Sequence, residues 1–99
     1  MRPKKLKKIL FKPNVFYFKP RGVPLRELEE VLLLPEELSA LHLKNILGLD
    51  QSESAKKMQT SQSTFQRILT SAYKKISVAL LQGRAIRFIK IKDIEEREV

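Results

Sequence analysis

The chain has no cysteine and only one histidine among its 99 residues. The absence of cysteine excludes disulfides, thiolate zinc sites, iron–sulfur clusters and cysteine nucleophiles, and one histidine is too few for a histidine metal cage. We therefore expect neither a metal nor a cofactor. A chain of this length forms one small domain held together by packing, so large multidomain enzymes are excluded as well.

Long apolar runs are also missing. No run exceeds four residues, as at Val31–Leu34 and Val78–Leu81, whereas a membrane-spanning helix needs roughly 20. The basic start of the chain is followed only by Ile9–Phe11 before Lys12 and Pro13, which is shorter than the apolar region of a signal peptide. We expect a cytoplasmic, nucleoid-associated protein without a membrane partner.

Nothing in the sequence indicates catalysis or a small-molecule substrate. Three scattered glycines do not form a phosphate-binding loop. Glu36 and Glu37 are adjacent on a predicted helix and point about 100° apart, so they suit a helix start better than acid–base chemistry. His42 has no third group to orient it in a catalytic triad and is expected at a core boundary. We expect that the protein is not an enzyme.

Acidic residues are absent from two long stretches of the chain. Residues 1–26 and 56–92 each carry nine basic and no acidic residues, whereas 27–55 carry a net charge of −6 and 93–99 a net charge of −3. A solvated surface normally mixes both signs. The overall charge of +9 therefore predicts two surfaces that face a polyanion.

Strands are predicted near both ends of the chain. Residues 1–14 are basic and interrupted by prolines, which predicts an arm that includes Arg2, Lys4 and Lys5. The aromatic segment 15–18 predicts a short strand, and residues 86–92 its antiparallel partner. The alternation slips by one residue after Phe88, which fits a bulge or a strand covered on both faces. Residues 21–24 predict a turn. The domain should then cover 15–92, with an acidic tail at 93–99.

Helical patterns fill the middle of the chain. The first predicted helix begins at Pro35 and ends at Gly48, and the second begins at a capping box formed by Asp50 and Glu53. Residues 25–34 fit either a helix or an extended segment. The apolar residues expected to face the core from the first helix are Leu38, Leu41, Leu43, Ile46 and Leu47.

The third predicted helix is the longest. Ser61 is placed to cap it and Gly83 to stop it. Its apolar residues recur at steps of three and four. These residues are Phe65, Ile68, Leu69, Ala72, Tyr73, Ile76, Ala79 and Leu80. The overall expectation is a mainly α fold of three or four helices with a two-stranded antiparallel β element.

Residues 51–70 have the layout of a helix-turn-helix. Ala55 permits two helices to approach closely, Met58 packs beneath them, and Phe65 with the Ile68–Leu69 pair holds the second helix against the first. The turn contains Gln59, at a position that tends toward positive φ and is commonly glycine. A residue with a side chain costs on the order of 1 kcal/mol there.

The outward face of the third helix suits DNA. At 100° per residue, Ser63, Arg67, Thr70 and Lys74 lie opposite the apolar stripe. Arg67 fits guanine, Gln62 or Gln66 fits adenine, and Ser63 or Thr70 fits a base or a phosphate. We expect phosphate contacts from three lysines and from the backbone N–H groups at the start of the helix. These are Lys56, Lys57, Lys74 and the helix end at Ser61.

Several segments carry a resemblance to a known family. They are 18–31, in which Phe18–Pro24 is the most specific part, and 37–43, 47–51, 61–69 and 75–80. In them the sequence resembles an uncharacterised prokaryotic family of small predicted DNA-binding proteins, whose helix-turn-helix is similar to the fourth region of sigma factors. The resemblance covers about residues 2–90. It implies sequence-specific DNA binding and transcriptional regulation, carried by the positions that match the family: Ser61, Thr64, Phe65 and Arg67.

Four positions depart from the family pattern. The family has glycine at Gln59, alanine at Ser54, and typically arginine and glutamine at Gln62 and Ser63. Because the last two positions lie on the expected base-reading face, a shared target sequence does not follow from the resemblance.

Three functions remain open at this stage. The first is a regulator that binds double-stranded DNA through the third helix, with the basic arm along phosphates or a minor groove and with a homodimer as an expected assembly. The second is an interaction module whose acidic 27–37 segment or apolar 31–34 run docks RNA polymerase or another partner. The third is an RNA or single-strand binder that stacks bases on Phe16, Tyr17 and Phe18.

Overall fold

The structure, a computed structural model, describes residues 17–88. Along the chain these form β1 (Tyr17–Phe18), the 3₁₀ turn η1 (Leu25–Glu27), β2 (Glu30–Leu33), α1 (Pro35–Leu41), the π-helical turn η2 (His42–Ile46), α2 (Gln51–Lys57), α3 (Gln62–Gln82) and β3 (Ala85–Phe88). The predicted mainly helical class with a small β element is confirmed. The predicted arm (1–14), the bulge after Phe88 and the acidic tail (93–99) lie outside the described residues.

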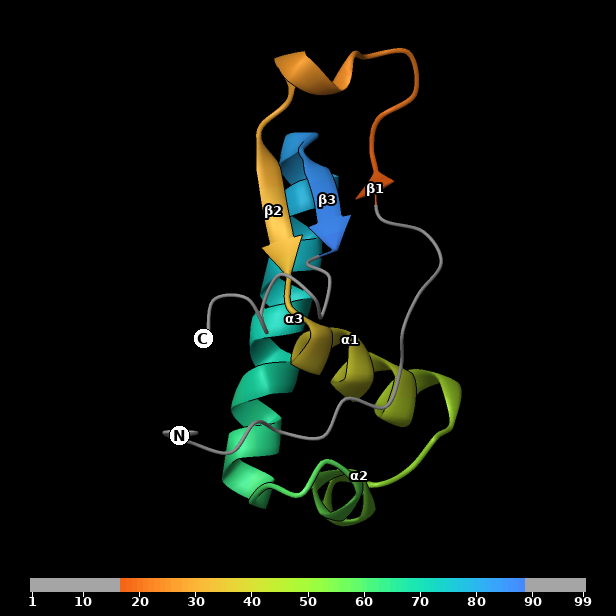
Figure 1. The fold of residues 1–99 in the computed structure, drawn as a ribbon, viewed down its shortest axis with the longest axis vertical. Helices are drawn as coiled ribbons and strands as arrows, with labels where there is room; N and C mark the ends of the chain where they lie inside the picture. The colour runs from red at the N-terminus through yellow and green to blue at the C-terminus, as the bar shows by residue number, and fades with distance from the viewer. Residues whose placement is uncertain (1–16, 89–99) are drawn as a thin grey trace, which may run out of the picture.

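α3 runs the length of the molecule, as Figure 1 shows. α1 packs alongside its middle and α2 lies across its N-terminal end, whereas the sheet lies at its C-terminal end. With 21 residues at 1.5 Å per residue, α3 is about 30 Å long. The two ends of the molecule are therefore separated by nearly the whole length of this helix.

The sheet has three strands, in the order β1-β3-β2. β1 is antiparallel to β3, as the sequence predicted, and the structure places Phe18 opposite Ile86. β2 pairs with β3 in parallel, with Leu33 opposite Phe88. The expected two-stranded element was therefore one strand short, because the ambiguous 25–34 segment supplies β2. A parallel pair needs a long crossover, and α1, α2 and α3 form it.

The core joins all three α-helices. Seven buried side chains form it, and Leu49 and Leu41 pack against its edge. The seven are Ala40, Leu43, Ala55, Met58, Phe65, Ile68 and Leu69. The residues that the sequence assigned to the contact between the second and third helices are thus in place. Met58 and Phe65 are fully buried, so they fix how α2 sits on α3.

Two predicted core positions of the first helix are wrong. Ile46 is 73% exposed, and Leu47 is exposed as well. The reason is the π-helical turn η2, in which the Leu47 N–H donates to His42 O at 3.0 Å, five residues back. A wider turn changes the angle between successive side chains. The two residues therefore rotate off the core stripe that a regular α-helix would have given them.

Two predicted core positions of the third helix are wrong for a different reason. Tyr73 is 42% and Leu80 is 74% exposed. Both lie at the edge of the apolar stripe, whereas Ala72 and Ala79 lie at its centre and are buried. α1 and α2 cover only the first part of α3, and the small sheet covers the remainder. The edge of the stripe is therefore left uncovered.

Candidate nucleic-acid interface

The turn between α2 and α3 keeps a left-handed residue where the sequence placed one. Gln59 has φ of 58° and is the one described non-glycine residue with positive φ. Its N–H donates to Lys56 O and the N–H of Thr60 to Ala55 O, both at 3.0 Å. These two bonds are those of a Schellman motif, which normally uses glycine at this position. Gln59 therefore adopts a backbone conformation that usually belongs to glycine.

Side-chain caps define where the two helices of the motif begin. Asp50 Oδ1 accepts from the N–H of Glu53 at 2.8 Å, and Ser61 Oγ accepts from the N–H of Thr64 at 3.1 Å. Both caps were predicted. Gln51 Nε2 also donates to Gln62 O at 3.1 Å, which ties the start of α2 to the start of α3. The arrangement is compatible with a helix-turn-helix.

The predicted outward face of α3 is exposed. Ser63, Gln66, Arg67, Thr70 and Lys74 all lie in solvent, and α3 contains no acidic residue. Within the described part of the chain, neither Arg67 nor Lys74 forms an ion pair with a carboxylate. A row of hydrogen-bonding and cationic side chains therefore covers the side of the helix opposite the core.

Hydrogen bonds organise this face. The Ser61 hydroxyl donates to Thr64 Oγ1 at 2.9 Å, and Arg67 Nη2 donates to the same oxygen at 3.3 Å. Gln66 Nε2 donates to Thr70 Oγ1 at 3.1 Å. Thr64 is only partly exposed, so its hydroxyl lies between the cap and Arg67 rather than on the outer row. Its predicted role as a DNA contact thus shifts toward support of Arg67.

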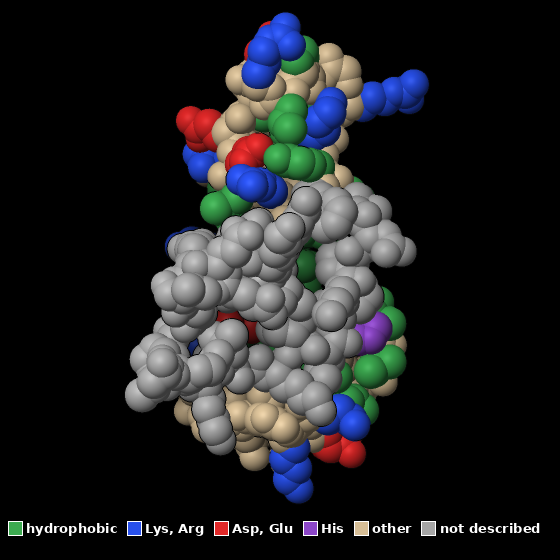
Figure 2. Space-filling model, viewed as in Figure 1, with side chains coloured by type: hydrophobic (Ala, Val, Ile, Leu, Met, Phe, Trp, Pro, Cys, Tyr) green, Lys and Arg blue, Asp and Glu red, His purple; other side chains and the backbone are tan. Residues whose placement is uncertain are grey.

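The remaining predicted contacts surround the start of α3. Lys56, Lys57, Ser61 and Gln62 are exposed. Figure 2 shows basic side chains in blue at this end of the molecule, with an acidic group in red beside one of them. Arg2, Lys4 and Lys5 lie outside the described residues.

Two basic residues of the 56–92 stretch do not face outward as free charges. Lys75 Nζ donates to Glu37 Oε1 at 2.9 Å and to Leu32 O at 2.7 Å. Arg84 Nη2 lies 3.1 Å from Glu29 Oε1. The prediction that this whole stretch faces a polyanion is therefore too broad. The acidic 27–55 segment neutralises part of the stretch inside the domain.

Glu37 was predicted only as a helix-start acid, but its structural role is larger. Oε1 also accepts from the N–H of Leu34 at 2.9 Å, and Oε2 accepts from the Ser71 hydroxyl at 2.6 Å. The N–H bond could have been predicted, because glutamate at the third helical position commonly bonds back to the capping residue. The partners on α3 lie 34 and 38 positions away, and no local sequence signal indicates them.

Other kinds of site are not found in residues 17–88. No group of three or more potential metal-ligating side chains occurs there. None of the helices in this range has the length and apolar character that would let it cross a membrane.

Comparisons with known proteins place the chain in a family. Residues 1–97 match the family described as "Protein of unknown function DUF134". A UPF0251 protein from Caldanaerobacter subterraneus subsp. tengcongensis is 54% identical over 86 residues, which are 87% of this chain and 73% of that relative. A UPF0251 protein from Halothermothrix orenii is 48% identical over 87 residues, which are 88% of this chain and 64% of that relative.

A third relative, the UPF0251 protein from Desulforudis audaxviator, is 52% identical over 86 residues, which are 87% of this chain and 56% of that relative. The chain therefore spans between about half and three quarters of the length of these three relatives. No solved structure matches. The chain belongs to the DUF134 family of UPF0251 proteins.

Proposed function

We propose that this member of the DUF134 family binds double-stranded DNA in a sequence-specific manner and regulates transcription. In this proposal α2, the turn at Gln59 and α3 act as a helix-turn-helix, with the first half of α3 in the major groove. One observation carries the proposal. The exposed face of α3 presents polar and basic side chains without any carboxylate, on a helix fixed by a buried core.

The side chains of this face have the chemistry that base edges require. A guanidinium donates two parallel bonds to the O6 and N7 of guanine, and a carboxamide both donates to and accepts from adenine. Arg67 and Gln66 supply these groups from adjacent positions of α3. Thr64 supports Arg67 through the 3.3 Å bond, which lowers the entropy cost of ordering this side chain on a base.

Phosphate contacts fix the register of such a helix on the duplex. Lys56 and Lys57 at the end of α2 and Lys74 on α3 are exposed and flank the polar row. The free N–H groups at the start of α3 add a partial positive charge. We assign the basic arm with Arg2, Lys4 and Lys5 to the neighbouring backbone or minor groove.

The arrangement of the aromatic residues argues against the single-strand alternative. Tyr17 and Phe18 are consecutive in β1, so their rings lie on opposite faces of the sheet. The Phe18 ring packs against Phe88 with centroids 5.9 Å apart. A base-stacking platform needs neighbouring open aromatic rings on one face. Of the described rings on this face, Phe88 is only partly exposed, which leaves Phe18 as the open one. Double-stranded DNA is therefore the better-supported ligand.

Selection of bound duplexes from a random pool tests the proposal. We expect one enriched motif, and a dissociation constant for the selected duplex at least about 1,000-fold below that for a scrambled duplex at the same salt concentration. A pool that stays random, with equal affinity for all duplexes, would show that the basic face gives nonspecific binding only. That result would favour the interaction-module alternative.

A further inference from the structure

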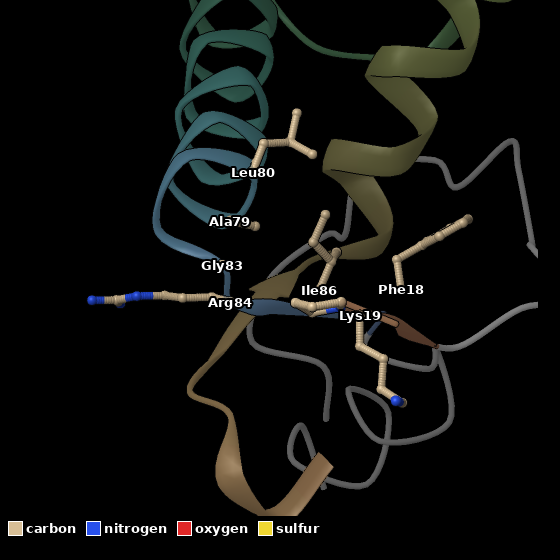
Figure 3. A pocket seen from close by; sticks show the side chains of 8 residues that line it. Phe18, Lys19, Ala79, Leu80, Gly83, Arg84 and Ile86 are labelled. Atoms are coloured by element: carbon tan, nitrogen blue, oxygen red, sulfur yellow. The ribbon is translucent and has the colours of Figure 1, made fainter. Parts of the chain in front are cut away.

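The sheet end of the molecule carries an exposed apolar patch that neither the core nor the DNA-facing row uses. Leu80 and Leu81, in the last turn of α3, are 74% and 85% exposed, and Phe18 in β1 is 58% exposed. Phe18 and Leu80 line one cavity, and Leu81 follows Leu80 on the helix. We name these three residues the sheet-end patch. A cavity of about 350 Å³ is lined by Phe18, Leu80 and Ile86, among others. Figure 3 shows that Leu80 comes from the last turns of α3 and that Phe18 and Ile86 come from the strands beside it.

We propose that the sheet-end patch is the interface through which two copies of this chain form a two-fold symmetric dimer. The dimer itself does not depend on the proposed function. Only its expected spacing of DNA half-sites rests on that function. In a two-fold interface the same surface serves on both copies and must complement itself. A protruding leucine beside a cavity satisfies this requirement, because Leu80 of each copy enters the cavity of the other.

The exposed apolar area is of the size that a dimer needs at its centre. Large apolar side chains with these exposed fractions offer roughly 350 Å² on each copy. A stable interface buries about 800 Å² per partner, of which the central part is apolar and the rim polar. The sheet-end patch therefore supplies the centre, and the surrounding polar residues supply the rim.

The rim carries both signs of charge. Arg84 lies at the edge of the apolar cavity and also lines an adjoining cavity of about 270 Å³ with Glu27 and Glu29. Figure 2 shows basic, acidic and apolar side chains mixed at this end of the molecule. Because Arg84 and Glu29 pair within one copy, the rim carries little unbalanced charge and does not oppose contact between two copies. On a chain of net charge +9, such a mixed surface favours self-association.

A second exposed apolar cluster, around Ile46, lacks a rim with both signs of charge. Ile46 lies beside a shallow cavity of about 220 Å³ lined also by Leu38, Leu41 and His42. The exposed charged residue of that turn is Lys44, and η2 has no acidic residue. Two such surfaces would bring like charges together, so the sheet-end patch is the better self-complementary surface.

The length of α3 links this interface to DNA. From Arg67 to Leu80 the chain advances thirteen positions, or about 20 Å along the helix. A two-fold axis near Leu80 therefore allows the two Arg67 side chains to lie up to about 40 Å apart, which includes the 34–36 Å between major grooves one turn apart on the same face of DNA. The dimer should then recognise inverted half-sites about one helical turn apart.

Sedimentation of the full chain without DNA tests the interface. We expect a dimer at about 50 µM, and a dissociation constant at least tenfold higher for Leu80→Glu. Ile46→Glu is the matched control, because Ile46 is 73% exposed and the substitution is the same. Circular dichroism should show both variants folded. A monomeric wild type, a dimer unaffected by Leu80→Glu, or a dimer broken by Ile46→Glu would overturn the proposal.

Crosslinking gives an independent measurement, because the wild-type chain has no cysteine. Under mild oxidation Leu81→Cys should yield a disulfide-linked dimer and Ile46→Cys should stay monomeric; the reverse pattern would overturn the proposal. The experiments distinguish a failure of the proposed DNA-binding function from a failure of the proposed dimer. A dimer that selects no DNA motif contradicts the proposed function alone, whereas a selected motif bound by a monomer contradicts the dimer alone.

Discussion

Lys75 and Glu37 form an ion pair across 38 positions of sequence, with Nζ and Oε1 2.9 Å apart. The Glu37 side chain is only 4% exposed, whereas that of Lys75 is 30% exposed. Ser71 on α3 donates to the same carboxylate, and the Leu34 N–H donates to it locally at the start of α1. The pair thus anchors the middle of α3 to the junction of β2 and α1.

Removal of Lys75 should destabilise the domain. Lys75→Met leaves the Glu37 carboxylate buried without its cation, and we expect the free energy of unfolding to fall by about 2–3 kcal/mol, since partial exposure of the lysine moderates the loss. Lys74→Met is the control, because Lys74 is exposed; it should stay within about 0.5 kcal/mol of wild type. Urea denaturation measures both, and equal effects would contradict the anchoring role.

Ser54 offers a stabilising substitution. Its Oγ is fully buried and has no hydrogen-bond partner, and an unsatisfied buried hydroxyl costs about 1–3 kcal/mol. Ser54→Ala should therefore raise the free energy of unfolding by about 1 kcal/mol, visible as a higher melting temperature. Ser52→Ala on the same helix removes a more accessible hydroxyl and should give a smaller gain. A loss of stability in Ser54→Ala would mean that the hydroxyl is bonded.

The backbone at Gln59 predicts a pair of opposite effects. Gln59→Gly removes the steric cost of φ near 58° and should stabilise the domain by up to about 1 kcal/mol. Gln59→Val places a β-branched side chain in the left-handed region and should destabilise it by more than about 1 kcal/mol. Thermal unfolding of the two variants checks the sign. Similar melting temperatures would contradict the left-handed turn.

The helix cap at Ser61 should contribute to the stability of the domain. Ser61→Ala leaves the Thr64 N–H without its acceptor and should cost about 1 kcal/mol of stability. Ser63→Ala is the control, because its hydroxyl is exposed and lies 3.3 Å from Ser61 Oγ without capping the helix. Denaturant titrations should show a larger loss of unfolding free energy for Ser61→Ala than for Ser63→Ala. A larger loss for Ser63→Ala would mean that Ser61 is not the cap of α3.

Arg67 should affect specificity as well as affinity. On the selected duplex, Arg67→Ala should weaken binding by about 1–3 kcal/mol and relax the preference at one base pair. Arg26→Ala removes the same charge from an exposed residue of η1, at the far end of α3, and should change affinity little. Binding assays on the selected duplex and on single-base variants separate the outcomes. A uniform loss on every duplex would make Arg67 a phosphate contact.

Local sequence signals accounted for the ends of most elements. Asp50, Ser61 and Gly83 each act on backbone groups within a few residues, so their effects can be predicted without knowledge of the fold. The exposed face of α3 follows likewise from periodicity once Phe65 and Ile68 are assigned to the core. The exposure of most of the proposed DNA contacts could therefore be predicted from the sequence.

Other features depended on segments that are distant in sequence. The 25–34 segment was ambiguous because it becomes a strand only beside β3, more than fifty positions later. The pairing of Lys75 with Glu37 depends on the packing of α3 against α1, which no local preference encodes. The exposed Leu80 and Ile46 reflect how far neighbouring elements extend and where a π-helical turn occurs.

The sequence by itself determined the absence of cysteine chemistry, the two acid-free basic stretches, the helix caps and the polar face of α3, because these depend on composition or on a few adjacent residues. Only the tertiary structure decided which cations are neutralised inside the domain and which apolar side chains remain exposed. The physical reason is that ion pairing and burial are set by distances in space, which the crossover from β2 to β3 establishes between residues far apart in the chain.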